Sequence, residues 1–260
     1  MKRFAKTILA TLIPGLIAAS NAYAATPAAN VSPAERAKIE SVVHDYLVSN
    51  PQVIVEAVQT LQRKQYEQAE QTVKQTQKIA PQFASALFNQ KGDPMAGNPD
   101  GAITIVEFFD YQCPHCVDMA PVIDSIIKAN PNVRYVFKEF PIRGPVSDFA
   151  SRAAIAANMQ GKYYVFSHAL LTSKQEPLTQ DSILKIAKDA GLDVDKLKKD
   201  MDSDAVASQL KANIKLAQDL KLFGTPAFFI SKSKNTTNVA YVPGQMNQKQ
   251  MQDAIDTANK

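Results

Sequence analysis

The feature that most constrains the fold is a pair of cysteines three positions apart, placed where an apolar run ends. Cys113 and Cys116 are the chain's only cysteines, and they follow closely on the β-rich segment AITIVEFF (102–109). A structural disulfide stabilises a protein most when it closes a long loop, and this ring is too short for that benefit. The pair is therefore interpreted as reactive chemistry.

The segments around the cysteines predict a parallel βαβ unit. Residues 116–131 have a helical pattern that the cysteine pair opens, and Pro121 is expected to kink this helix. NVRYVFKEF (132–140) then has the pattern of a second buried strand. Strand, helix and strand in this order favour two parallel strands joined by a crossover helix.

The rest of the main domain is expected to begin near Phe83 and to continue the α/β pattern. SALFNQ (85–90) is a candidate edge strand, and residues from about 145 to 222 have helical patterns throughout. Two further strands, PAFFIS (226–231) and VAYVPG (239–244), precede a terminal helix. Because an apolar strand pattern returns after a long helical block, the helices are predicted to interrupt one sheet.

The first residues have the pattern of a secretory signal peptide. Three basic residues within the first six positions precede an apolar run, and Ala22-Tyr23-Ala24 places small residues at a cleavage site. We expect residues 1–24 to be removed, because the apolar run is short for a membrane anchor and Pro14 interrupts it. Removal reduces the formal net charge from +4 to about +1, which argues against a nucleic-acid partner. An oxidising compartment would suit disulfide chemistry.

Residues 25–80 predict a separate helical segment. Ser32 and Glu35 form a capping box for one helix, and Asn50 with Pro51 begins a second. Each helix has one apolar face, made by Ile39, Val43, Tyr46, Ile54, Val58 and Leu61. The polar sequence that follows indicates a solvated helical stalk. The apolar faces either fold back on the main domain or pair with another copy; we favour a homo-oligomer, with a dimer favoured over a trimer.

The cysteine motif now identifies a family resemblance. C-x-x-C where a strand meets a helix is the thioredoxin-like redox arrangement, and with Pro114-His115 between the cysteines VEFFDYQCPHC resembles the active-site segment of the DsbA family. The helical block resembles that family's inserted domain. VVHDYLVSNPQVIVEAVQTLQRKQ resembles the oligomerisation segment of ScsC-like and oligomeric DsbA-like members.

This resemblance implies an α/β, thioredoxin-like fold with an inserted helical domain, preceded by an N-terminal helical segment. The implied domains are a signal peptide (1–24), an oligomerisation segment with its stalk (25–80) and a catalytic domain (81–260) with its insertion at about 145–222. The implied function is a periplasmic thiol:disulfide oxidoreductase that forms or isomerises disulfide bonds in secreted proteins. Its expected partners are unfolded or misoxidised secreted proteins and a DsbB-like or DsbD-like membrane protein.

The residues of the motif suggest their own roles. Cys113 lies just before a helix, where unsatisfied N–H groups and a protonated His115 favour the thiolate, so its pKa should be depressed. Cys116, one turn further, should be buried and act as the resolving thiol. No cofactor is expected beyond the Cys113–Cys116 disulfide, and no metal, because a closed zinc site needs four ligands.

Further site residues follow from the resemblance. Thr225-Pro226 resembles the cis-proline loop that holds an extended substrate chain, and threonine at this position is more typical of isomerase-like members. Glu107 matches the family's buried acid, a proton acceptor below the cysteines. Lys138 is either its partner or an exposed charge on a strand. His168 is expected to have a packing or surface role.

Two classes of function remain open from the sequence. The first is the enzyme described above, with the balance between oxidase and isomerase undecided. The second is a redox-silent surface-binding protein or holdase chaperone that retains the thioredoxin fold. Reduction of insulin with a thiol donor separates the two, because only the enzyme needs Cys113.

Overall fold

The computed structural model describes residues 31–173 and 177–260, and the predicted signal peptide with its cleavage site lies outside these residues. The chain forms two compact units, one ending at Gln62 and one running from Arg63 to Lys260. Within the described residues, no helix combines the length and apolar character needed to cross a membrane.

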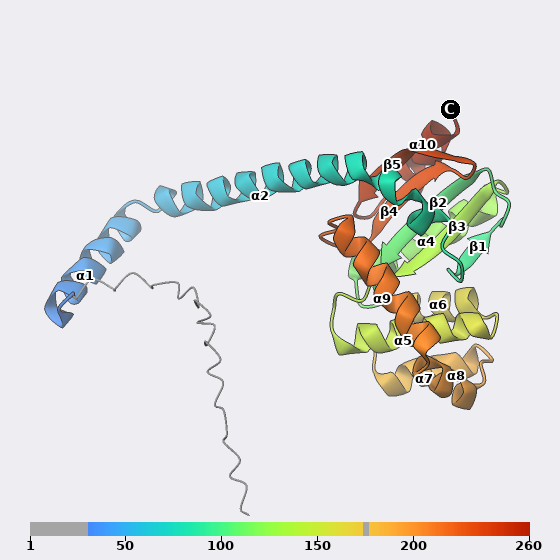
Figure 1. The fold of residues 1–260 in the computed structure, drawn as a ribbon. Helices are drawn as coiled ribbons and strands as arrows, with labels where there is room; N and C mark the ends of the chain where they lie inside the picture. Colours follow the sequence, from blue (N-terminus) through green and yellow to red (C-terminus); the bar gives the residue numbers. More distant parts are fainter. Residues whose placement is uncertain (1–30, 174–176) are drawn as a thin grey trace, which may run out of the picture. The chain divides into compact units, whose positions relative to one another are not determined.

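The first unit contains helix α1 (Pro33–Ser49) and the beginning of helix α2 (Gln52–Ile79) (Figure 1). The capping box is present as predicted: the Glu35 N–H donates to Ser32 Oγ, and the Ser32 N–H donates to the Glu35 carboxylate. Asn50 differs from its prediction as a cap of α2. Its side-chain nitrogen donates to the Tyr46 carbonyl oxygen at 2.9 Å and so closes α1 instead.

The second unit is built on one mixed sheet of five strands in the order β1-β3-β2-β4-β5. β2 (Ile103–Phe109) and β3 (Val133–Glu139) are parallel, which confirms the predicted βαβ unit around helix α4 (Pro114–Ala129). β4 (Ala227–Lys232) and β5 (Asn235–Pro243) extend the sheet on the other side of β2 as antiparallel strands. α4 continues through Pro121 as one helix.

The predicted edge strand at residues 85–90 was wrong. The edge strand is β1 (Met95–Gly97), and the earlier residues form helix α3 (Ala84–Phe88), which follows a 3₁₀ turn, η1 (Ala80–Phe83). Leu87 and Phe88 are both buried in one apolar cluster. Neighbouring side chains of a strand point to opposite faces, so a helix is the conformation that places both on one side.

The helical block that the sequence predicts is present between β3 and β4. In the described residues it consists of helices α5 (Pro145–Met159), α6 (Tyr163–Leu171), α7 (Gln180–Asp189), α8 (Val194–Met201) and α9 (Asp204–Asp219). α5 to α8 lie together at one end of the sheet, while α10 (Gln248–Asn259) packs on the sheet itself (Figure 1). The apolar side chains of α5 to α8 are continuous with those of β2 and α4, so the insertion shares the sheet's core.

Each face of β2 is covered by a different cluster, and every residue of the strand is buried. Ile105 and Phe109 belong to the cluster that contains α4 and the inserted helices. Val106 and Phe108 belong to the cluster on the other face. A strand buried on both faces reads as a continuous apolar run, which is what the sequence shows at this point.

The C-terminal end of α2 packs on the second face. Thr76 is buried and its hydroxyl donates to the Leu220 carbonyl oxygen at 2.9 Å. Gln77 accepts the Tyr241 N–H at 2.7 Å and donates to the Val239 carbonyl, so its amide pairs with the free edge of β5. The structural unit that carries the cysteines therefore begins at Arg63, earlier than the predicted boundary at residue 81, and the end of the predicted stalk is part of it.

Candidate active site

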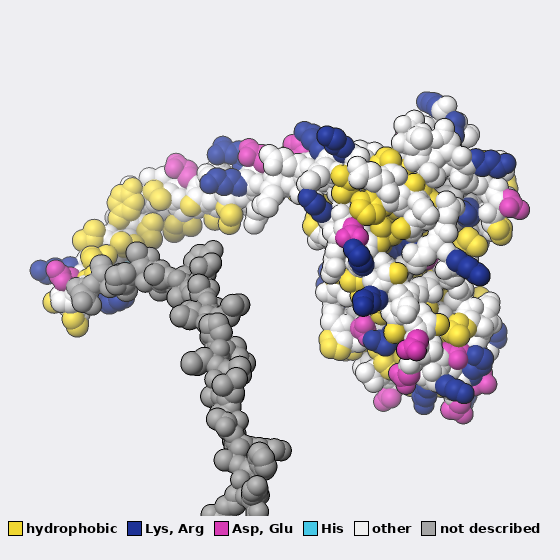
Figure 2. All heavy atoms as spheres, viewed as in Figure 1, with side chains coloured by type: hydrophobic (Ala, Val, Ile, Leu, Met, Phe, Trp, Pro, Cys, Tyr) yellow, Lys and Arg dark blue, Asp and Glu magenta, His cyan; other side chains and the backbone are white. Residues whose placement is uncertain are grey.

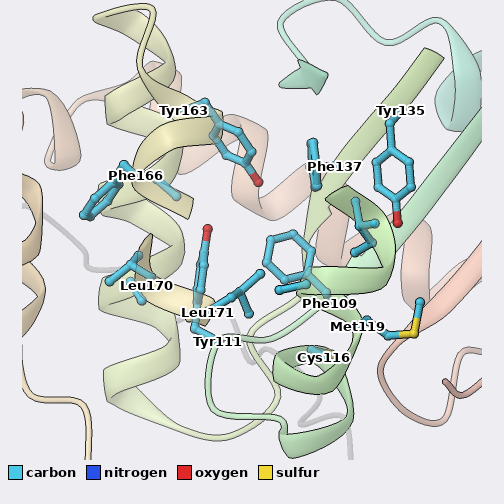
Figure 3. Close-up of a cluster of buried hydrophobic side chains, with 14 of the residues drawn as sticks. Phe109, Tyr111, Cys116, Met119, Tyr135, Phe137, Tyr163, Phe166, Leu170 and Leu171 are labelled. Atoms are coloured by element: carbon cyan, nitrogen blue, oxygen red, sulfur yellow. The ribbon is translucent and has the colours of Figure 1, made fainter. Parts of the chain in front are cut away.

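The strand–helix junction places the two cysteines at different depths of the same helix end. Cys113 is the N-cap of α4 with extended backbone angles (φ −83°, ψ 116°), and Pro114 occupies the first helical position. Both cysteines are free thiols with 1% of their surface exposed, whereas Pro114 and His115 are exposed. Cys116 lies among the buried side chains of α4 and β2, close to Phe109 and Met119 (Figure 3).

Several donors converge on the sulfur of Cys113 and lower its pKa to about 5. The largest contribution is a hydrogen bond from the Cys116 side chain, and burial opposes it. Thr225 and the backbone N–H groups of Cys116 and His115 add to the effect. The N–H groups at a helix start have no partner within the helix, so they can donate to an anion there.

Thr225 faces Cys113 with two different groups. In the thiol form, Cys113 Sγ donates to the Thr225 carbonyl oxygen at 3.2 Å. The Thr225 hydroxyl is buried and has no hydrogen-bond partner among the described residues. That hydroxyl can therefore donate to the sulfur once the thiolate forms, which accounts for its lowering of the Cys113 pKa.

Cys116 has the opposite electrostatic environment. Burial raises its pKa far above the ordinary range, and the hydrogen bond to Cys113 and the charge of Glu107 raise it further. Desolvation disfavours a charged group, so this thiol stays protonated until it reacts. The two cysteines are thus separated into a thiolate and a buried, protonated thiol.

Glu107 lies on the face of β2 that carries α4, and 1% of its surface is exposed. Burial raises its pKa to about 8, the Tyr135 hydrogen bond lowers it, and the charges of Glu139 and Cys113 raise it. The Tyr135 hydroxyl donates to Glu107 Oε2 at 3.0 Å. Sequence reasoning missed Tyr135, although the alternation of β3 could have found it: residues 135 and 137 share the face on which Glu107 lies.

Lys138 matches neither of its two predictions, as the partner of Glu107 or as an exposed charge. It aligns with Phe108 in the neighbouring strand and points to the other face of the sheet, where it is fully buried. Its ammonium lies 2.5 Å from Asp93 Oδ2 and donates to the Ala86 carbonyl oxygen at 2.8 Å. Lys138 therefore ties β3 to α3 and to the segment before β1.

A second buried acid, Glu139, connects the active-site loop to the inserted helices. Its Oε1 accepts hydrogen bonds from Tyr111 at 2.9 Å and from Tyr163 at 2.6 Å, and burial raises its pKa to about 8. The hydroxyls of these two tyrosines point into the space between β3 and α6 (Figure 3). Tyr111 lies two residues before Cys113, so this network anchors the loop that leads into α4.

The rim of the site is formed by His115 and the loop of Pro226. His115 Nδ1 lies 2.5 Å from Gln245 Oε1, so the imidazole is directed to Gln245 and the contribution of His115 to the Cys113 thiolate comes from its backbone N–H. The Thr225–Pro226 peptide bond is cis, as the resemblance implies. The Gly244 N–H donates to the Pro226 carbonyl oxygen at 2.8 Å and joins this loop to the end of β5.

Beside the cysteines lies a groove of about 650 Å³. It borders the start of α4 and the end of α6, and its lining includes Tyr111, Pro114, Val117, Leu170 and Leu178. No group of His, Cys, Asp and Glu side chains suited to hold a metal ion occurs in the described part of the chain.

The residues predicted to form an oligomer interface all lie in the first unit, on α1 and on the first turns of α2. All six, namely Ile39, Val43, Tyr46, Ile54, Val58 and Leu61, are exposed in the single chain, between 48% and 56%. Hydrophobic side chains gather along α1 and the beginning of α2, whereas the later turns of α2 are mostly polar (Figure 2). Apolar patches of this kind mark interaction sites.

Comparisons with known proteins agree with this architecture. Residues 104–256 match the family of DSBA-like thioredoxin domains, and residues 35–68 match the N-terminal domain of the copper resistance protein ScsC. A thioredoxin-like oxidoreductase from Silicibacter pomeroyi DSS-3 is 42% identical in sequence, with 67% of this chain and 96% of that chain covered and a TM-score of 0.62.

Two further solved structures extend over the N-terminal helices as well. BcfH from Salmonella enterica Typhimurium is 33% identical, with 87% of this chain and 97% of that chain covered and a TM-score of 0.64. A linker-deletion variant of Proteus mirabilis ScsC is 25% identical, with 89% and 98% covered and a TM-score of 0.61. Among curated relatives, the Na(+)/H(+) antiporter NhaA 3 of Salinispora tropica is 28% identical over 141 residues, and the chain spans only 22% of its length.

Proposed function

The chain belongs to the family of DSBA-like thioredoxin domains and is of the type with an ScsC-like N-terminal segment, and from this premise we propose that it is a periplasmic thiol:disulfide oxidoreductase that forms or isomerises disulfide bonds in secreted proteins. The observation that carries the proposal is the opposite displacement of two pKa values at one helix start. The pKa of Cys113 is lowered to about 5, and that of Cys116 is raised.

In the oxidising direction, a substrate thiolate attacks Cys113 Sγ of the Cys113–Cys116 disulfide. The sulfur–sulfur bond breaks, Cys116 leaves with the electron pair and takes a proton, and a mixed disulfide joins the substrate to Cys113. A second substrate thiolate then attacks the substrate sulfur and releases the Cys113 thiolate. The substrate gains a disulfide, the enzyme gains two electrons, and the low pKa of Cys113 makes it a good leaving group.

In the isomerising direction, the reduced enzyme begins the cycle. The Cys113 thiolate attacks a wrong substrate disulfide, and the freed substrate thiolate attacks a different substrate disulfide. The thiolate released in that second exchange then attacks the mixed disulfide and frees Cys113 without net oxidation. Cys116 frees the enzyme from a substrate that fails to rearrange, because its sulfur attacks Cys113 Sγ and displaces the substrate thiolate. A DsbB-like membrane partner would reoxidise the dithiol and a DsbD-like partner would reduce the disulfide.

The N-terminal helices support the isomerase side of this proposal. Their exposed apolar faces would join two or more chains, so that several Cys113 sites act on one substrate. Tethering raises the effective concentration of a second site to the mM range without new contacts at the site itself. The same assembly would hinder a membrane oxidase from docking at each Pro226 loop.

Two variants of α2 test the oligomer. Leu61→Glu adds a charge to the apolar face, and Gln62→Glu adds the same charge to the neighbouring polar position as a matched control. We expect Leu61→Glu to be a monomer by light scattering, to reduce insulin normally and to lose most activity on scrambled ribonuclease, while Gln62→Glu behaves as the parent. If Leu61→Glu remains an oligomer, or isomerises as well as the parent, the N-terminal helices have another role.

The redox function is tested separately. Cys113→Ser should abolish insulin reduction with a thiol donor. A variant that keeps full activity in this assay, or a parent protein that lacks it, would leave the redox-silent binding function in place of the enzyme.

A further inference from the structure

The proposed function leaves one chemical requirement unassigned. Each time Cys116 attacks or leaves, a proton moves off or onto its buried sulfur, and Glu107 is the neighbouring group that can take or supply it. Glu107 is itself sealed from solvent, with 1% of its surface exposed. A docked substrate covers the Cys113 side of the site during this step. Exchange of the Glu107 proton with solvent therefore requires a path on another side of the site.

The hydrogen bond of Glu107 leads away from the cysteines. Its partner is the Tyr135 hydroxyl, which donates to Oε2 at 3.0 Å. The rings of Tyr135 and Tyr164 both pack on Phe137, with ring centroids 4.9 Å and 5.8 Å from it. Tyr164 also interacts electrostatically with both Tyr135 and Glu107, so these three side chains are coupled beside Phe137.

From Tyr164 the polar contacts continue to the surface. The Tyr164 hydroxyl donates to Asp124 Oδ1, and Asp124 Oδ2 lies 2.8 Å from His168 Nε2. The side chains of Asp124 and His168 are 24% and 34% exposed. They line a surface pocket of about 300 Å³ together with Tyr164, and Lys128 is the basic residue of the lining.

We propose that Tyr135, Tyr164, Asp124 and His168 form a proton relay between Glu107 and solvent, opening between α4 and α6, with one water bridging the two tyrosine hydroxyls. A water links two hydroxyls by accepting a hydrogen bond from one and donating to the other. His168 thereby acquires a role beyond the packing or surface role that its helical pattern suggests.

The solvent end of the relay lies away from the substrate-binding side of the cysteines. Asp124 lies ten residues after Pro114 along α4, which is about 15 Å of helix. A substrate bound over Cys113 therefore leaves the pocket of His168 open. An imidazole is the side chain best suited to exchange protons with water near neutral pH.

Protons and electrons balance in the resolving step. Cys116 loses its proton to the Glu107 carboxylate and attacks Cys113 Sγ of the mixed disulfide, and the substrate leaves as a thiolate. Glu107 then passes its proton to Tyr135 while Tyr135 releases its own toward Tyr164. Each tyrosine gains one proton and loses one, so neither becomes charged, which its raised pKa would disfavour. Asp124 and His168 deliver the proton to water.

The charged and titratable groups around the relay come from four elements. Glu107 on β2 is faced by Tyr135 and Glu139 of β3 and by the two cysteines at the start of α4. The outer end is faced by Lys128 of α4 and by Tyr164 of α6. Glu139 accepts hydrogen bonds from Tyr111 and Tyr163, and Tyr163 supplies a control beside Tyr164 in the sequence.

The test separates the two thiol steps in one reaction. Reduced protein is mixed with Ellman's reagent in stopped flow at low buffer concentration and several pH values. The first release of thionitrobenzoate reports attack by Cys113, and the second reports displacement by Cys116. Tyr164→Phe and His168→Ala should leave the first phase unchanged and slow the second about tenfold. Added imidazole should restore the second phase in His168→Ala.

Tyr163→Phe is the matched control, because it deletes the hydroxyl that donates to Glu139, the other buried acid, and leaves every member of the relay in place. Its second phase should be slowed far less than that of Tyr164→Phe. A slowed second phase that imidazole does not restore, or equal slowing in Tyr163→Phe, would mean that these residues only tie α6 to α4, and the relay is then overturned. Unchanged second phases in both relay variants overturn it as well. A parent protein without a fast first phase would instead contradict the proposed function.

Discussion

The hydrogen bond between the two cysteines is the largest single stabiliser of the Cys113 thiolate, so its removal should raise the pKa of Cys113. Cys116→Ala deletes the donor. A hydrogen bond to a charged group contributes about 1.5–3 kcal/mol, and one pKa unit corresponds to about 1.4 kcal/mol. Because S–H is a weak donor, the lower end applies. The pKa of Cys113 should therefore rise from about 5 by roughly one unit.

The pKa is measured from the ultraviolet absorbance of the thiolate and from the rate of alkylation, each against pH. In the reduced parent, the strongly raised pKa of Cys116 leaves Cys113 as the only thiol that titrates in the accessible range. Cys116→Ser is the matched control, because its hydroxyl keeps a donor at nearly the same place. Its midpoint should lie below that of Cys116→Ala.

Two results would refute this reasoning. An unchanged midpoint in Cys116→Ala would show that the hydrogen bond contributes nothing to the thiolate. A midpoint at the ordinary value of 9.0 would show that Thr225 and the backbone N–H groups, which the variant keeps, contribute nothing either.

The buried ionisable groups Cys113, Lys138 and Glu107 have three further measurable consequences. The depressed pKa of Cys113 stabilises the reduced protein fully above the unfolded value of 9.0, and this contribution is lost as the pH falls through about 5. As the pH is lowered from 9.0 to about 5, the melting temperature of the reduced protein should therefore fall relative to that of the oxidised protein. A constant difference between the two melting temperatures would contradict the assignment. Lys138→Ala leaves Asp93 buried without its partner and should lower the free energy of unfolding in urea by about 3–5 kcal/mol without changing the reactivity of Cys113; a loss below about 1 kcal/mol would contradict the buried pair. Tyr135→Phe removes a hydrogen bond that lowers the pKa of Glu107, so that pKa should rise above about 8 by roughly one to two units, as followed by the infrared band of the protonated carboxyl; an unshifted band titration would contradict the assignment.

The sequence was sufficient for every feature that depends on neighbouring residues. The capping box of Ser32 and Glu35 needs a spacing of three, and it forms as predicted. Cys113 could be identified as the thiolate because a helix start exposes N–H groups whatever the rest of the fold does. The parallel βαβ unit likewise follows from the order of local patterns along the chain.

Tertiary structure alone decided which side chains meet the buried acids. Tyr135 lies 28 residues from Glu107, and Tyr163 lies 24 residues from Glu139. Such pairs depend on strand register and on which helix covers which face, and one step along a strand moves a side chain to the opposite face. Lys138 was misassigned for this reason: on the far side of β3 its charge is buried against Asp93. A pKa set by burial and by a distant partner is therefore a property of the packed fold, whereas a cap or a helix start is a property of a few consecutive residues.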